Sequence, residues 1–70
     1  MNDIEKLPID KESARLLIGG LRQDIYMLGA NDSEFSFIES ILVELETGDI
    51  SPQNAVDQVM AIKERKQSYH

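Results

Sequence analysis

The sequence predicts an all-α protein, a small three-helix bundle. Apolar residues recur at spacings of three and four along three stretches, each stretch begins at a capping residue, and glycines follow the first two. We expect helices at about 11–28, 33–47 and 52–66. Connections of three or four residues turn neighbouring helices antiparallel or to a steep angle, so the order should be up-down-up. No alternating strand pattern competes with this interpretation.

Length and composition bound the organisation of the chain. Its 70 residues suffice for one domain, which we expect at 10–70, after an extended or disordered leader at 1–9. The absence of cysteine leaves neither a disulfide framework nor a thiolate metal site. The longest apolar run is three residues, 16–18, far short of the roughly 20 that span a membrane. We therefore expect a cytoplasmic protein with no membrane contact.

The first helix has signals at both ends. Asp10 is placed to cap its first turn, and Gly29 supplies the left-handed position that ends it. We expect its apolar stripe to face the core, and Leu17 widens that stripe. The residues of the stripe are Ala14, Ile18, Leu21, Ile25 and Leu28.

Two adjacent glycines, Gly19 and Gly20, interrupt the first helix. Each costs about 1 kcal/mol relative to alanine in a helix interior. Their presence therefore predicts a bend or a close helix crossing, and the alternatives are a hinge or a notch in which a partner docks.

The second helix follows a cluster of capping residues. Asn31 and Glu34 fit a capping box, with Asp32 and Ser33 as alternative caps, and a glycine at position 48 ends the helix. Phe37 lies off the centre of the apolar stripe, so it is either a second core contact or an exposed anchor for a partner. The stripe itself consists of Phe35, Ile38, Ile41, Leu42 and Leu45.

The third helix has the clearest start. Ser51 caps it, Pro52 takes the first helical position, and Ile50 can staple onto Ala55. The basic residues near its end, at 63, 65 and 66, complement the helix dipole. A small contact with nucleic acid or an acidic peptide is the functional alternative for that tail. The apolar side of this helix consists of Ala55, Val56, Val59, Met60 and Ile62.

Acidic residues dominate the middle of the chain. The chain has 13 acidic and 7 basic residues, a formal charge of −6, and between Arg22 and Lys63 there are eight carboxylates and no basic residue. This field repels nucleic-acid phosphate and attracts basic proteins. The alternative is that the charge serves solubility alone. The residues that we expect to contact a basic protein partner are Glu34, Phe37, Glu39, Glu44, Glu46 and Asp49.

No pattern in the sequence indicates catalysis, a cofactor or a metal site. The glutamates of the second helix fan around its axis, and the segment 31–34 lacks the alternating ligands of a calcium loop. The single histidine is the last residue, so no serine has an activating base inside the fold. We therefore expect no enzymatic activity.

The segment 45–51, Leu-Glu-Thr-Gly-Asp-Ile-Ser, with Ala55 following, resembles the helix–Gly-Asp–helix turn of the exonuclease VII small subunit. It is also similar to the helical hairpins of bacterial accessory and antitoxin-like proteins. These resemblances imply an accessory role and assign no site residue.

Two hypotheses about function follow from these patterns. In the first, the chain is a small bacterial or phage regulator or accessory protein that binds a protein partner through its acidic surface, as an antitoxin, an inhibitor or a small subunit does. In the second, it is an assembly module that self-associates through apolar helix faces. A homodimer is expected under either, because pairing is a usual remedy for the thin core of a small domain.

Overall fold

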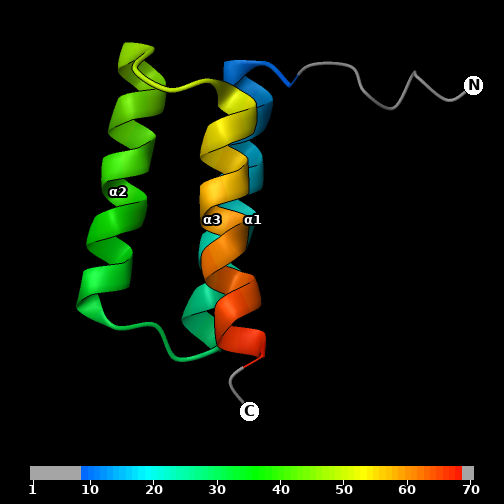
Figure 1. The fold of residues 1–70 in the computed structure, drawn as a ribbon, viewed down its shortest axis with the longest axis vertical. Helices are drawn as coiled ribbons and strands as arrows, with labels where there is room; N and C mark the ends of the chain where they lie inside the picture. The colour runs from blue at the N-terminus through cyan, green and yellow to red at the C-terminus, as the bar shows by residue number, and fades with distance from the viewer. Residues whose placement is uncertain (1–8, 69–70) are drawn as a thin grey trace, which may run out of the picture.

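The computed structural model describes residues 9–68 and contains three helices. They are α1 (Lys11–Met27), α2 (Asp32–Thr47) and α3 (Pro52–Gln67). In Figure 1, α1 and α3 run in the same direction and α2 runs antiparallel to both. The predicted all-α, three-helix fold is confirmed. The predicted leader lies outside the described residues except for Ile9, which packs against the core.

Each helix begins at the capping residue that the sequence predicts. The side chain of Asp10 accepts a hydrogen bond from the backbone N–H three residues later at 2.8 Å, and the Ser51 hydroxyl does the same at 3.2 Å. Asn31 and Glu34 form a complete capping box, in which each side chain accepts the other's backbone N–H at 3.0 and 3.1 Å. These bonds satisfy amides that otherwise lack a partner in the first turn.

Two glycines make the connections between helices. Gly48 caps α2 with φ +86°, and Gly29, with φ +92°, follows the cap Leu28 of α1. Only glycine adopts such angles without steric cost. The two connections are short, so α2 is held antiparallel to its neighbours.

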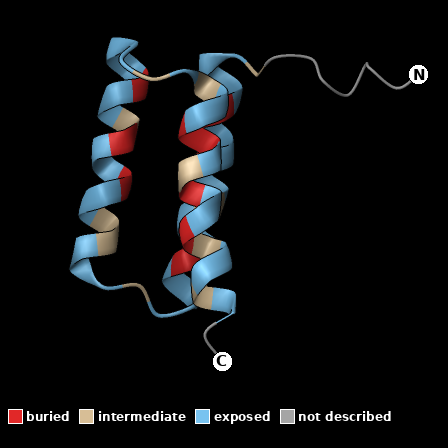
Figure 2. Ribbon diagram, in the orientation of Figure 1, coloured by how far each residue is buried: buried red, intermediate tan, exposed pale blue. Residues whose placement is uncertain are grey.

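The core lies along the inward faces of the three helices, where the buried residues appear as red bands in Figure 2. Small side chains at Ala14 and Ala55 let α1 and α3 approach each other closely, whereas α2 contributes larger residues and packs less closely on either. The buried residues are Ala14, Ile18, Ile25, Ile38, Ile41, Leu45, Ala55, Val56, Val59 and Ile62.

Four apolar residues of the predicted core are more exposed than expected. Leu28, the cap of α1, is 36% exposed and is not a core residue. Leu17 is 48% exposed and Met60 is 38% exposed, so neither is a core residue. Phe37 is 47% exposed, which contradicts its interpretation as a second core contact. Leu17, Met60 and Phe37 lie at the flank of the buried stripe, where a three-helix bundle has no fourth helix to cover them.

Gly19 and Gly20 do not mark a helix crossing. Both are exposed, and a Cβ atom added at either position would meet no atom of another residue within 4 Å. The predicted close approach of another backbone is therefore wrong. None of the helices in the described part of the chain is long and apolar enough to cross a membrane.

Replacing Ile41 with alanine tests the packing of α2. Ile41 is 1% exposed, so the substitution should reduce the free energy of unfolding by about 2–4 kcal/mol, through lost burial and a residual cavity. Urea denaturation followed by circular dichroism measures this. Val43→Ala is the matched control, because Val43 is 60% exposed and its truncation should change stability by less than about 0.5 kcal/mol. Equal effects of the two substitutions would mean that the buried face of α2 is assigned wrongly.

Candidate protein-binding surface

Two arginines of α1 pair with two glutamates of α2. The Arg15 Nη2 atom lies 2.7 Å from Glu46 Oε2, and the Arg22 Nη2 atom lies 3.7 Å from Glu39 Oε2. The arginines are seven residues apart on α1 and the glutamates seven apart on α2. Because the helices are antiparallel, Arg15 near the start of α1 meets Glu46 near the end of α2, and Arg22 meets Glu39 one heptad further along the seam.

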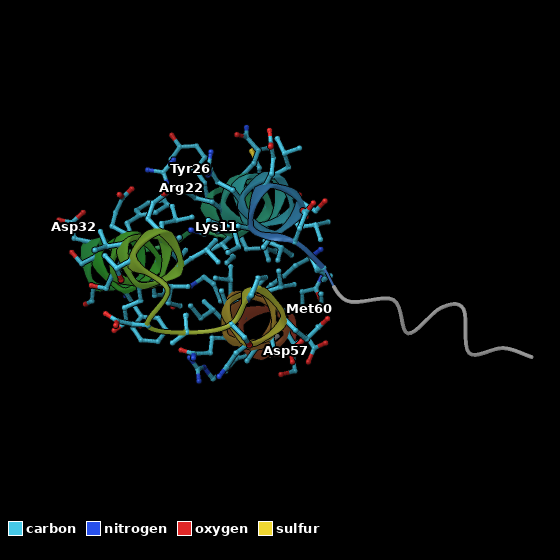
Figure 3. The ribbon with its side chains drawn as sticks, turned by 90° about the horizontal axis from the view of Figure 1, so that it is seen from above. Lys11, Arg22, Tyr26, Asp32, Asp57 and Met60 are labelled. Atoms are coloured by element: carbon cyan, nitrogen blue, oxygen red, sulfur yellow. The ribbon has the colours of Figure 1, made fainter. Side chains whose placement is uncertain are left out.

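Further contacts extend this seam at both of its ends. Lys11 Nζ donates a hydrogen bond to the backbone carbonyl of Glu46 at 3.2 Å. At the opposite end, the rings of Tyr26 and Phe35 lie 6.0 Å apart, and the Arg22 guanidinium lies 5.1 Å from the centre of the Phe35 ring. Figure 3 shows Arg22 and Tyr26 on the side of α1 towards α2, with Lys11 between the helices.

Two lysines of α3 pair with carboxylates of the other helices. Lys63 Nζ lies 2.9 Å from Asp24 of α1, and Lys66 Nζ lies 3.0 Å from Glu34 of α2. The Lys66–Glu34 pair is the less exposed of the two, because only 18% of the Lys66 side chain and 23% of the Glu34 side chain are accessible. The pKa of Glu34 is held below its ordinary value of 4.5. The hydrogen bond from the Asn31 N–H is the larger cause, and the contact with Lys66 is the second. Glu34 therefore joins the cap of α2 to α3.

These pairs divide the carboxylates that the sequence assigned to one binding surface. Glu39 and Glu46 lie at the seam with α1, whereas Glu34 lies at the seam with α3. Glu44 and Asp49 form no ion pair with any described residue, although Asp49 accepts a hydrogen bond from the Thr47 hydroxyl at 3.0 Å. The structure therefore leaves two of the five predicted carboxylates available to a partner.

The remaining negative charge is concentrated at one end of the bundle. The half formed by residues 9–19 and 40–59 contains six carboxylates and two basic residues. The half formed by residues 20–39 and 60–68 contains five carboxylates and four basic residues. We call the first half the acidic end. It includes the α2–α3 turn and the start of α1, and its carboxylates are Asp10, Glu12, Glu44, Glu46, Asp49 and Asp57.

A shallow hollow lies between α2 and α3 beside Phe37. Its volume is about 230 Å³, and it is lined by Ser33, Glu34, Phe37, Ile62 and Arg65. The ring of Phe37 is half-exposed at this hollow. Glu44 lies seven residues after Phe37 and so shares its side of α2. This flank of α2 combines an aromatic ring, an apolar hollow and an unpaired carboxylate towards the acidic end.

The side chains on this flank could contact both apolar and cationic groups. Among residues 9–68, no group of three or more histidine or acidic side chains is placed to hold a metal ion. An apolar side chain of a partner could contact Phe37 and Ile62, while cationic groups could contact Glu44 and Asp49.

The basic partners of the ion pairs and the contribution of α3 to the hollow were not predicted from the sequence. A signal for the first was present, because the seven-residue spacing of Arg15 and Arg22 matches that of Glu39 and Glu46. No local pattern indicates Arg65, since its place beside Phe37 depends on the packing of α3 against α2.

Comparisons of the chain with protein-family models, with curated proteins and with solved structures found no match. The similarity of residues 45–51 to the turn of the exonuclease VII small subunit remains a resemblance of that segment. What the chain binds is therefore inferred from the chemistry of its own surface.

Acid titration tests the role of Glu34. Its lowered pKa stabilises the folded state above pH 4.5, and this stabilisation is lost as pH falls through the folded-state pKa, because the unfolded state binds more protons in that interval. Glu34→Gln keeps a side chain suited to a capping box but removes the charge. We expect the variant to be less stable than the wild type at neutral pH, with a difference that shrinks well below pH 4.5.

Urea denaturation at a series of pH values measures this difference. Glu64→Gln is the control, because Glu64 makes no ion pair with a described residue, so its replacement removes one carboxylate without removing such a pair. Parallel pH profiles of the wild type and Glu34→Gln would contradict the assigned role. Some pH dependence should persist in every variant, because the Ser13 N–H also lowers the pKa of Asp10.

Proposed function

We propose that this chain is a small acidic helical regulator or accessory protein, bacterial or phage, that acts through protein–protein contacts. The half-exposed Phe37 beside the α2–α3 hollow carries this proposal. Aromatic residues at interfaces often supply a large share of the binding energy when a partner excludes water from them. The chain would act as an antitoxin, an inhibitor or a small subunit does, by covering a surface of its partner, and not by catalysis.

The charges around Phe37 define the chemistry of the partner. An apolar side chain of the partner would enter the hollow, and basic side chains would contact Glu44 and Asp49 near the α2–α3 turn. The predicted contacts Glu34, Glu39 and Glu46 already have cationic partners within the chain, so we assign them mainly to holding the helices together. The direct contacts are then Phe37, Glu44 and Asp49.

The overall charge supports a basic protein partner. A formal charge of −6 attracts cationic surfaces at long range, and it opposes binding to nucleic-acid phosphate. Such attraction is screened by salt and raises the association rate more than it slows dissociation. The cysteine-free composition fits the cytoplasmic location that we propose.

Self-association is a second candidate function, and the outer side of α1 favours it. Leu16 is 73% exposed and Met27 is 74% exposed, more than any other large apolar residue in the described chain. Apolar residues that gather on one exposed face are a feature of interaction surfaces. Such a chain would be an assembly module or a homodimeric accessory protein, with its acidity serving solubility.

Affinity capture from the native host tests the partner-binding proposal. The immobilised wild type is compared with Phe37→Ala, with the double variant Glu44→Gln/Asp49→Asn, and with Val43→Ala as an exposed control on α2. We expect one host protein to bind the wild type and the control equally, and to bind Phe37→Ala about tenfold more weakly or worse. Quantitative mass spectrometry of the captured proteins measures the difference.

The salt dependence separates the two kinds of contact. For the double variant, binding should be weaker than the wild type at low salt and should approach it as salt is raised, because only the charge contribution has been removed. Circular dichroism confirms that each variant is folded. Equal capture by Phe37→Ala and the wild type would contradict the proposed surface. Recovery of the chain's own second copy alone would favour the self-association candidate.

A further inference from the structure

The basic residues of the described chain contact other helices, with one exception. Of the six basic residues within 9–68, four form ion pairs with carboxylates of another helix, and Lys11 donates a hydrogen bond to the Glu46 carbonyl. The guanidinium of Arg65 forms neither contact with a described residue, and Arg65 is exposed. Residues 9–68 also contain eleven carboxylates. An arginine with which none of them pairs is available to a partner.

Glu34 lines the same hollow between α2 and α3 as Arg65, but both of its carboxylate oxygens are already occupied. Oε1 accepts hydrogen bonds from the Asn31 N–H at 3.1 Å and from Lys66 Nζ at 3.0 Å, and Oε2 lies 3.3 Å from Lys66 Nζ. The Asn31 N–H lowers the pKa of Glu34 most, Lys66 lowers it next, and the charge of Arg65 lowers it least. This edge of the hollow therefore carries two positive charges and one negative charge.

The hollow combines this positive charge with apolar surface. Phe37 and Ile62 supply the apolar part of its lining, and Arg65 and Ser33 lie beside them. The Ser33 hydroxyl forms no hydrogen bond with a described residue, so it is a second available donor. The volume of about 230 Å³ is below the roughly 300–1,000 Å³ of pockets that enclose a whole small ligand. The hollow therefore suits one apolar side chain of a partner, with an anionic group at its edge.

We propose that the partner segment that fills the hollow carries a carboxylate beside its apolar side chain, and that this carboxylate pairs with Arg65. The planar guanidinium matches a carboxylate with two parallel hydrogen bonds, and the Ser33 hydroxyl supplies a third donor. The inference rests on the proposed function. It adds an acidic group to the apolar and basic groups already assigned to the partner.

The charge of the whole chain selects a single carboxylate over a polyanion. A formal charge of −6 repels the closely spaced phosphates of nucleic acid, and one guanidinium does not offset that repulsion. A carboxylate on an otherwise basic protein segment brings one negative charge to the place where a cation is available. The long-range attraction of the basic segment to this acidic chain is then preserved.

The charged contacts give the partner segment a polarity. Glu44 follows Phe37 by seven residues, which is about 10 Å along α2 towards the acidic end. Arg65 lies beside Phe37, in the other half of the bundle. The segment should therefore carry its carboxylate next to the apolar side chain and its basic side chains about 10 Å further along. The reverse arrangement would set like charges against both Arg65 and Glu44, which opposes binding.

Three small probes that share a phenyl group test the charge preference of the hollow. They are the anion phenylacetate, the neutral phenylacetamide and the cation phenethylamine, each titrated into the ¹⁵N-labelled chain at low salt. Nuclear magnetic resonance shifts of the backbone amides of residues 33–37 and 62–65 report binding at the hollow. We expect phenylacetate to bind there about two- to fivefold more tightly than phenylacetamide, the range for an exposed ion pair, and phenethylamine to bind most weakly.

Two variants of equal net charge assign the preference to Arg65. Arg65→Gln should remove the advantage of phenylacetate over phenylacetamide. Gln23→Glu is the matched control, because it also lowers the net charge by one unit, at an exposed position of α1 that does not line the hollow. The control should retain the advantage, and circular dichroism checks that both variants are folded. The host protein captured by the wild type should likewise bind Arg65→Gln about two- to fivefold more weakly and bind Gln23→Glu as the wild type does.

The outcomes separate the acidic group of the partner from the binding surface itself. Tighter binding of phenethylamine at the hollow, an advantage of phenylacetate that survives Arg65→Gln, or no shift with any probe would overturn the inference. The proposed function would then still stand if Phe37→Ala weakens capture of the host protein. Equal capture by Phe37→Ala and the wild type would overturn both. A phenylacetate advantage that is lost in Arg65→Gln and retained in Gln23→Glu is the result that we expect.

Discussion

The burial of one apolar stripe on each helix fixes the rotation of that helix about its axis, and the rest of the structure depends on this constraint. In α1, Ile18 and Ile25 are fully buried. That rotation turns Arg15 and Arg22 towards α2, where they meet glutamates. It also turns Leu16 to solvent, where 73% of its side chain is exposed. A rotation that moved Leu16 inwards would expose the isoleucines, and each isoleucine contributes about 1.5–3 kcal/mol when buried.

The ion pairs are consequences of that rotation more than sources of stability. Exposed pairs contribute about 0.2–1 kcal/mol each, and the arginine–glutamate pairs of the α1–α2 seam are half-exposed. Their more important effect is on the distribution of charge. Basic residues from α1 and α3 neutralise part of the acidic block and leave most of the net charge at the acidic end. A chain that looks uniformly acidic in its sequence therefore has one strongly acidic half and one nearly balanced half.

The sequence predicted the fold well because its signals were local and agreed with one another. Asp10, Asn31 and Ser51 all cap the helices expected of them, and the buried stripes followed from spacing. The sequence could not show which of the predicted carboxylates are already paired within the chain, because the cations that pair with Glu39 and Glu46 come from another helix. The glycines were misread for a simpler reason. Gly20 lies two residues after the buried Ile18, on the far side of the helix, so periodicity alone could have placed it in solvent.

The central claim is that burial of one apolar stripe fixes the rotation of each helix about its axis. Nuclear magnetic resonance of ¹³C-methyl methionine, with a soluble paramagnetic agent, tests it most directly, because the rotation turns Met27 of α1 to solvent and places Met60 of α3 at the flank of the buried stripe. We predict that the agent broadens the Met27 methyl group more strongly than the Met60 methyl group, since 74% of Met27 and 38% of Met60 are exposed. A Met60 methyl group broadened as strongly as that of Met27, or more strongly, would contradict the claim.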